Sequence, residues 1–273
     1  MDESNLERRL CEVVVFTVIY PGCIDYLSDF VLSVENQSVD DISLVVVNDG
    51  VADAASYFPS HLHVVILEAA TNHFLSRLNG ILWIASQDCC KKLIFCDSDD
   101  VMSSQRVEKC IHHLDFADIY CHDLYTFNGN PEIVEAPRMF GFGGVKKLGF
   151  LTDDLILGNI FGLSNTAIRM NIVRDMRIAI PKSLPVFDWW FFSCCLEQKY
   201  QAVVTPECLG GYRQHDSNFA GAVTAVDLIK SLRVRFVHGR ALLGFANFSF
   251  ITKYWLFFLI YPMFYLSRHF GFF

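Results

Sequence analysis

An acidic cluster follows an apolar run near the middle of the chain. Residues 92–96 are mainly apolar and lead into Asp97-Ser98-Asp99-Asp100. At the frayed end of a strand, the spacing of Asp97 and Asp99 lets both carboxylates reach one divalent cation. Mg²⁺ and Mn²⁺ prefer oxygen ligands and often combine one or two carboxylates with substrate phosphates. The cluster therefore predicts a Mn²⁺ or Mg²⁺ site, with Asp97 and Asp99 as metal ligands, that makes a diphosphate a better leaving group. A solvated acidic turn is the alternative.

Alternating strands and helices must position this cluster. Apolar runs predict strands at residues 12–20, 43–48, 62–67 and 92–96, and helical patterns predict helices at 24–37 and 72–87. This alternation indicates βαβ units and a mainly parallel sheet. Ligands of such sheets bind at the carboxyl ends of the strands, so Asp49 and Asp97 are expected at the same edge. The Gly-rich stretch from 128 to 160 predicts loops.

The bulk composition limits the class of protein. A chain of 273 residues, 52% hydrophobic and 19% charged, has enough material for one large α/β domain and no signature of disorder. The net charge of -8 argues against a nucleic-acid partner. Ten cysteines without a Cys-x-x-Cys pair indicate reduced thiols, and the first residues lack a secretory pattern. We therefore expect the catalytic part to face the cytoplasm.

Five segments together carry a resemblance to a known family. They are the opening strand through Thr17 with Leu32-Ser33-Val34-Glu35-Asn36-Gln37-Ser38; Val47-Asn48-Asp49-Gly50; Arg77-Leu78-Asn79-Gly80; Phe95-Cys96-Asp97-Ser98-Asp99-Asp100; and Phe187-Asp188-Trp189-Trp190 with the stretch from Tyr212 to Asn218. In order and spacing they resemble the motifs of family 2 glycosyltransferases over residues 11–221. The resemblance implies an α/β protein of the GT-A type, whose Rossmann-like, mostly parallel sheet is flanked by helices.

The resemblance also implies roles for individual residues. Asp188 matches the general base of inverting members, which removes a proton from the acceptor hydroxyl. Asp49 and Arg77 match residues that face the nucleotide, and Thr17 belongs to the same nucleotide-sugar site. Asp97 matches a residue that contacts both the donor and the metal ion.

Other positions leave alternatives open. Arg213 and His215 are interpreted as a cationic pair on the diphosphate, or else as parts of a structural loop. The family's Ser after Asp-Gly is Val51 here, and Leu78 separates Arg77 from Asn79. Val51 would change the predicted nucleotide pocket, and the insertion of Leu78 affects the role predicted for Arg77.

The function implied by the resemblance is sugar transfer with inversion. The donor would be a nucleotide-diphospho-sugar and the acceptor a saccharide or lipid-linked saccharide, as in the synthesis of cell-surface polysaccharide or lipopolysaccharide. One alternative is a haloacid-dehalogenase-like phosphatase, with Asp97 as nucleophile and Asp99 as acid/base. Another is a catalytically inactive sugar-binding module.

The two ends of the chain are expected to lie outside the catalytic domain. The proposed division is an extension at 1–10, a catalytic domain at 11–221 and a helical, basic and aromatic-rich C-terminal tail at 222–273. The apolar stretch at 254–267 is shorter than the roughly 20 residues of a helical span and is rich in Tyr and Trp. We interpret it as an interfacial anchor that binds the protein peripherally to the inner face of the cytoplasmic membrane. A helix packed on the domain, or on a second copy, is the alternative.

Overall fold

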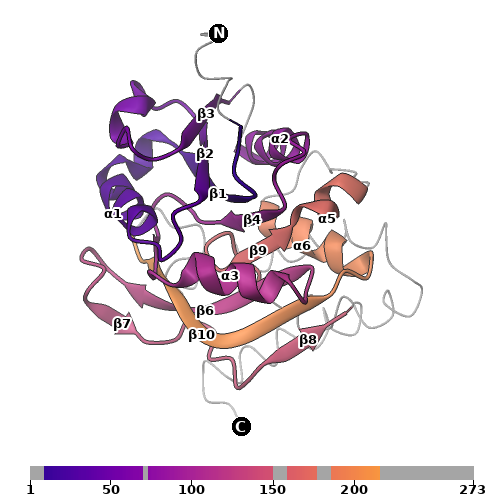
Figure 1. Cartoon of the computed structure of the whole chain (residues 1–273). Coiled ribbons are helices and arrows are strands. Elements are labelled where there is room, and N and C mark those ends of the chain that lie inside the picture. The colour runs from indigo at the N-terminus through magenta and orange to yellow at the C-terminus, as the bar shows by residue number, and fades with distance from the viewer. Residues whose placement is uncertain (1–8, 70–72, 150–158, 177–185, 216–273) are drawn as a thin grey trace.

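The computed structural model describes residues 9–69, 73–149, 159–176 and 186–215. A single twisted sheet runs through this part of the chain in the order β3-β2-β1-β4-β9-β6-β10-β5, with β7 paired to β6 and β8 to β10 (Figure 1). The strands are β1 (Val13–Ile19), β2 (Ile42–Asn48), β3 (Val64–Glu68), β4 (Lys92–Phe95), β5 (Val101–Met102), β6 (Ile119–Phe127), β7 (Val134–Ala136), β8 (Lys146–Leu148), β9 (Thr166–Arg169) and β10 (Ala202–Arg213).

The first half of the sheet is parallel, as the sequence predicts. Strands β3, β2, β1 and β4 are paired in parallel. All seven residues of β1 and all seven of β2 are buried, which explains why both read as continuous apolar runs rather than alternating ones. The four predicted strands are confirmed, with bounds that differ by one or two residues.

The second half of the sheet is mixed. Strand β9 runs antiparallel to both β4 and β6, while β6 and β10 are parallel to each other. The α/β class and the GT-A type of sheet are confirmed, but the sheet is mostly parallel only as far as β4. A short strand buried on both faces looks the same in sequence whichever way it runs, so the pattern could not predict this reversal.

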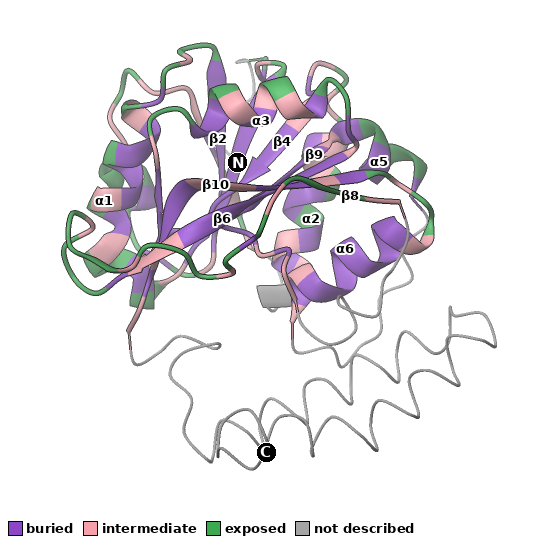
Figure 2. Cartoon of the chain, turned by 90° about the horizontal axis from the view of Figure 1, so that it is seen from below, coloured by how far each residue is buried: buried purple, intermediate pink, exposed green. Residues whose placement is uncertain are grey.

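Helices cover both faces of the sheet (Figure 2). α1 (Ile24–Glu35) and α3 (Arg106–Leu114) bury apolar side chains against one face. α2 (His73–Ala85), α5 (Met170–Asp175) and α6 (Phe187–Glu197) pack on the other. Two 3-10 turns complete the elements, η2 (Pro21–Cys23) and η3 (Ala54–Tyr57).

Gly80 of the third motif lies where α2 meets the sheet. A Cβ at this position would come within 2.6 Å of Val47 and 2.8 Å of Phe16. Only glycine lets the helix approach β1 and β2 this closely, because a methyl group there would overlap both side chains. The motif glycine therefore sets the position of α2, which carries Arg77.

Some predictions on the remaining segments can be compared with the structure. The helices predicted at 24–37 and 72–87 are α1 and α2, whereas the stretch from 128 to 160 contains the short strands β7 and β8 as well as loops. None of the ten cysteines forms a disulfide. Within the described ranges, no helix is both long and apolar enough to cross a membrane. The predicted tail at 222–273 and most of the extension at 1–10 lie outside the described residues.

Candidate active site

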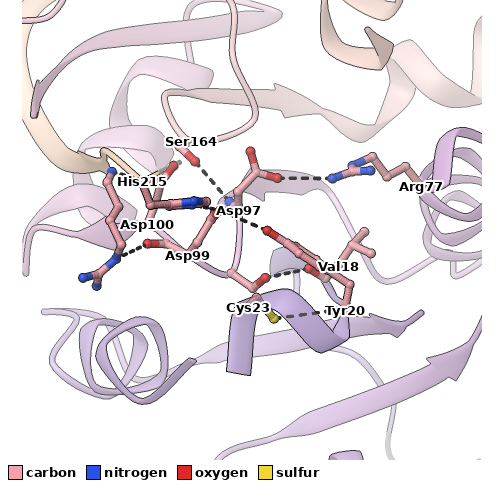
Figure 3. A network of polar contacts seen from close by, with 11 residues as sticks. Val18, Tyr20, Cys23, Arg77, Asp97, Asp99, Asp100, Ser164 and His215 are labelled. Carbon is pink, nitrogen blue, oxygen red and sulfur yellow. Dashed lines mark hydrogen bonds and ion pairs between the residues drawn. The ribbon is translucent and has the colours of Figure 1, made fainter. Parts of the chain in front are cut away.

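The acidic cluster forms a tight turn after β4. The backbone N–H of Asp97 donates to Oγ of Ser164 at 3.1 Å, and the Ser98 hydroxyl donates to the carbonyl of Val18 at 2.8 Å (Figure 3). Asp100 is buried and accepts the backbone N–H of Arg213 at 2.8 Å. These contacts tie the turn to β1, to β10 and to the segment before β9. Asp97 and Asp99 are left half-buried on its surface.

Asp99 is held by an aromatic and a histidine side chain. The Tyr20 hydroxyl donates to Oδ2 of Asp99 at 3.2 Å, and Nε2 of His215 lies 3.1 Å from the same oxygen. The His215 ring stacks on Tyr26 of α1 with 5.1 Å between ring centroids. His215, a predicted site residue, thus contacts both the acidic turn and α1, and its role on the diphosphate stays a prediction. Tyr20 was not predicted, because nothing local distinguishes it from other residues at the end of a strand.

Arg77 reaches Asp97 from α2. Nη2 of Arg77 lies 3.7 Å from Oδ1 of Asp97, and both side chains are partly exposed (Figure 3). Burial raises the pKa of Asp97 to about 6, while the positive charge of Arg77 lowers that pKa and the negative charge of Asp99 raises it. The inserted Leu78 therefore does not remove the arginine from the site; Leu78 itself is buried in the core.

Asp188 lies in the first turn of α6. Its Oδ1 accepts the backbone N–H of Trp189 at 2.7 Å, and the residue that caps the helix is Val186 rather than Asp188. Burial raises the pKa of Asp188 to about 7; the bond from Trp189 lowers that pKa, Asp97 raises it and Arg77 lowers it. Asp97 and Arg77 are therefore near enough to Asp188 to influence its pKa.

A buried asparagine organises the segment between these two carboxylates. Nδ2 of Asn165 donates to two backbone carbonyls at 2.9 and 3.0 Å, and its Oδ1 accepts the N–H of Gly162 at 2.7 Å. A Cβ at Gly162 would lie 3.9 Å from Oδ2 of Asp188, and the neighbouring Ser164 bonds Asp97. The segment thus lies between the acidic turn and the start of α6. Sequence reasoning missed both Ser164 and Asn165.

Of two predicted nucleotide residues, Thr17 lies within β1 and Asp49 lies directly after β2. Thr17 is only 1% exposed, and its Oγ1 has no hydrogen-bond partner among the described residues. Asp49 directly follows β2, is half-buried, and donates its backbone N–H to the carbonyl of Ile19 at 2.8 Å. As predicted, Asp49 and Asp97 lie at the same carboxyl edge of the sheet, after the two strands that flank β1 in parallel.

Arg213 has a different environment from the one expected of a diphosphate ligand. Its side chain is 2% exposed, donates from Nε to the carbonyl of Asp99 at 2.8 Å and from Nη1 to the carbonyl of Gly129, and pairs through Nη2 with Asp29 at 2.6 Å. The guanidinium also lies over the rings of Tyr26 and Phe127. These contacts favour the structural interpretation of Arg213, as a clamp that joins α1, the acidic turn and β6.

The acidic turn has the ligands that a hard divalent cation prefers. The side chains of Asp97 and Asp99 are 33% and 17% exposed, and the contacts of the Asp99 carboxylate with Tyr20 and His215 both involve Oδ2. No group of three or more His, Cys, Asp or Glu side chains with metal-ligand geometry occurs in the described ranges. A cation bound by these two aspartates would need its remaining ligands from a substrate diphosphate, as Mg²⁺ commonly takes them.

Comparison with protein families identifies the chain. Residues 14–172 match the sequence model described as glycosyl transferase family 2. The chain belongs to glycosyl transferase family 2. The match covers more than half of the chain and includes Thr17, Asp49, Arg77 and the acidic turn. It ends before Asp188 and before the stretch from Tyr212 to Asn218, so the roles of those residues rest on the geometry and on their motif.

Solved structures support the same fold for this glycosyltransferase. The chain resembles residues 1–349 of S. aureus TarS, crystallised with UDP-GlcNAc, with a TM-score of 0.65, 16% identity, and coverage of 96% of this chain and 73% of that one. A second TarS 1–349 structure, in complex with UDP, gives a TM-score of 0.60 at 16% identity, over 84% of this chain and 65% of that one. A longer TarS structure matches with a TM-score of 0.63 at 17% identity. The match covers 96% of this chain and 44% of that one. Comparison with curated proteins gives no significant match.

The family membership decides between the functions that the sequence left open. A glycosyltransferase is an enzyme of group transfer, and the acidic turn lies at the fourth strand of a sheet that matches the family from its first strand. The phosphatase that would use Asp97 and Asp99, and the inactive sugar-binding module, are not supported.

Proposed function

We propose that this glycosyltransferase moves a sugar from a nucleotide-diphospho-sugar to an acceptor hydroxyl with inversion, and that Asp188 is its general base. The observation that carries the proposal is the position of Asp188 in the first turn of α6, beside the segment whose Ser164 bonds Asp97. This half-buried carboxyl group has a pKa raised by burial to about 7. A base works best when its pKa lies near the working pH, because it is then both ionised and able to hold a proton.

The proposed reaction depends mainly on the position of the base and on positive charge near the leaving diphosphate. The ionised carboxylate of Asp188 would take the proton of the acceptor hydroxyl while the hydroxyl oxygen attacks the anomeric carbon. The bond from that carbon to the diphosphate oxygen breaks on the opposite face, which inverts the configuration. Asp188 would approach the donor sugar from α6 and the acidic turn from the end of β4, so the base and the leaving group would be held by different elements. Arg77 supplies a positive charge on the side of the leaving diphosphate.

Asp97 and Asp99 would hold Mn²⁺ or Mg²⁺ together with the diphosphate. When bound, such an ion neutralises the charge that develops on the leaving group. Tyr20 and His215 orient Asp99 through their contacts with its Oδ2, and Ser164 orients the backbone of Asp97. Thr17 and Asp49 complete the site on the nucleotide side.

The donor we propose is a UDP-sugar. Support comes from the likeness to TarS, which was crystallised with UDP and with UDP-GlcNAc. The test is a panel of UDP-, dTDP- and GDP-sugars, each incubated with the purified protein and Mn²⁺ while release of the nucleoside diphosphate is followed. We expect release from at least one UDP-sugar and none from GDP-sugars. Release from none of the panel, or from GDP-sugars alone, would contradict this choice of donor.

The acceptor we propose is a cell-surface polysaccharide or a lipid-linked precursor, reached at the inner face of the cytoplasmic membrane. Support comes from the sequence after residue 222, where Lys230, Arg233, Arg235 and Arg240 precede the aromatic stretch at 254–267. Removal of residues 245–273 should release the protein from vesicles that contain anionic lipid. Equal sedimentation of the truncated and full chains would contradict this part of the proposal.

A further inference from the structure

Asn48 and Glu68 form a hydrogen-bonded pair at the ends of β2 and β3. They are the last register partners of the two parallel strands. Nδ2 of Asn48 lies 3.1 Å from Oε1 and 3.0 Å from Oε2 of Glu68, and it also donates to the carbonyl of Val51 at 3.0 Å. An amide nitrogen carries two hydrogens, so one serves Val51 and the other is shared by the two carboxylate oxygens.

The orientation of the Asn48 amide is determined by a backbone contact. Its Oδ1 accepts the N–H of Val51 at 2.8 Å, which requires the nitrogen to face Glu68. The side chain thereby closes the turn from residue 48 to 51 on itself. Gly50 within this turn has φ +93°, a conformation that favours glycine, and Val51 is buried against the core. Asp49, the proposed nucleotide residue, is the second position of this turn.

The residue types of the pair are complementary. The turn after β2 reads Asn48-Asp49-Gly50, with an amide at its first position. An aspartate at 48 would place a second carboxylate about 3 Å from that of Glu68 and would remove both donated bonds. The amide at position 48, as a donor, therefore matches the carboxylate at position 68, as an acceptor.

We propose that Asn48 and Glu68 are positioning residues for nucleotide binding, acting through Asp49. This inference rests on the proposed role of Asp49 at the nucleotide. The pair fixes the turn from both strands, so that the Asp49 carboxylate is already oriented when the nucleotide binds. A contact that is equally strong in the ground state and the transition state affects affinity and not turnover. Loss of the pair should therefore weaken donor binding and leave kcat unchanged.

The test is a reversed pair, measured by calorimetric titration of UDP and Mn²⁺ into the full chain. Glu68→Ala should weaken binding several-fold and Asn48→Asp about tenfold, since a hydrogen bond to a charged group is lost. In Asn48→Asp/Glu68→Gln the glutamine amide can donate to the new carboxylate, so UDP affinity should recover relative to Asn48→Asp alone. The bond to the Val51 carbonyl is not restored, so the recovery is expected to be partial.

Three results distinguish this inference from the function on which it rests. Unchanged UDP affinity in Glu68→Ala, or a double variant that binds no better than Asn48→Asp, would overturn the coupling. Asp49→Asn tests the proposed site itself: weaker UDP binding there, with no effect of Glu68→Ala, would reject only the positioning role. If Asn48→Asp does not fold, the variants Glu68→Ala and Glu68→Gln at the exposed Glu68 still test the positioning role. That role requires an unchanged kcat and a raised donor KM in Glu68→Ala.

Discussion

Arg77 and Asp97 form an ion pair between α2 and the end of β4, with 3.7 Å between Nη2 and Oδ1. The pair joins α2 to the turn that carries the proposed metal ligands. The close approach of α2 to the sheet depends on Gly80. Because the contact is long and partly exposed, it contributes little to stability. We propose instead that Arg77, next to the acidic turn, contacts the donor diphosphate.

Replacement of Arg77 tests that role. Arg77→Met should raise the KM for the donor about tenfold or more, because a cation that faces the diphosphate is removed. Arg77→Lys keeps the charge and should retain part of the affinity. The free energy of unfolding should change by less than about 1 kcal/mol in both variants. A donor KM unaffected by Arg77→Met would exclude the contact.

The pKa of Asp188 predicts a pH dependence. Its carboxyl group must be ionised to accept a proton, and burial together with Asp97 raises its pKa to about 7, against the lowering effects of Trp189 and Arg77. The value of kcat/KM should therefore rise with pH up to about 7 and level off above it, falling about tenfold per pH unit on the acid side. A profile that is flat between about pH 5.5 and 8.5 would contradict the assignment of the base.

Arg213 is predicted to stabilise the fold rather than to bind the donor. Arg213→Lys cannot donate to Asp29 and to the carbonyls of Asp99 and Gly129 at the same time, so the free energy of unfolding should fall by about 3 kcal/mol. Chemical denaturation measures this change. An unchanged denaturation midpoint with a loss of UDP affinity would instead support the cationic contact with the diphosphate.

Ser164 is predicted to orient the acidic turn. Its hydroxyl is the acceptor for the N–H of Asp97, and Ser164→Ala would leave that N–H without this partner. We expect a loss of about 1–2 kcal/mol in unfolding free energy and a lower kcat. Ser164→Thr keeps the hydroxyl and serves as the matched control. If the alanine and threonine variants have the same kcat, the hydroxyl has no role in orienting the turn.

The sequence predicted the part of the fold that local patterns encode. The strands up to β4 are buried apolar runs closed by turn residues, and the helices between them have the expected length. The order of these elements along the chain could therefore be predicted from periodicity. The same patterns placed Asp49 and Asp97 at one edge of the sheet. The reversed direction of β9 escaped prediction, since its four residues are too few to show a direction.

The side chains that support the site could not be predicted from spacing. Tyr20, Ser164 and Asn165 act through contacts with residues far away in the chain, such as the 79 positions between Tyr20 and Asp99. Arg213 shows the same limit of prediction from sequence spacing. Its motif is compatible with a ligand contact and with a structural one, and only the packing of Tyr26, Phe127 and Asp29 around it distinguishes the two.

Asp188 is proposed to act as the base at a nucleotide-sugar site. The most direct measurement compares wild type and Asp188→Asn in sugar transfer and in UDP affinity with the same preparation. The asparagine keeps the size of the side chain and can still accept the bond from the Trp189 N–H. We predict that kcat falls by about 10²-fold or more while the affinity for UDP and the unfolding midpoint stay unchanged. Transfer by Asp188→Asn at the wild-type rate would exclude Asp188 as the base.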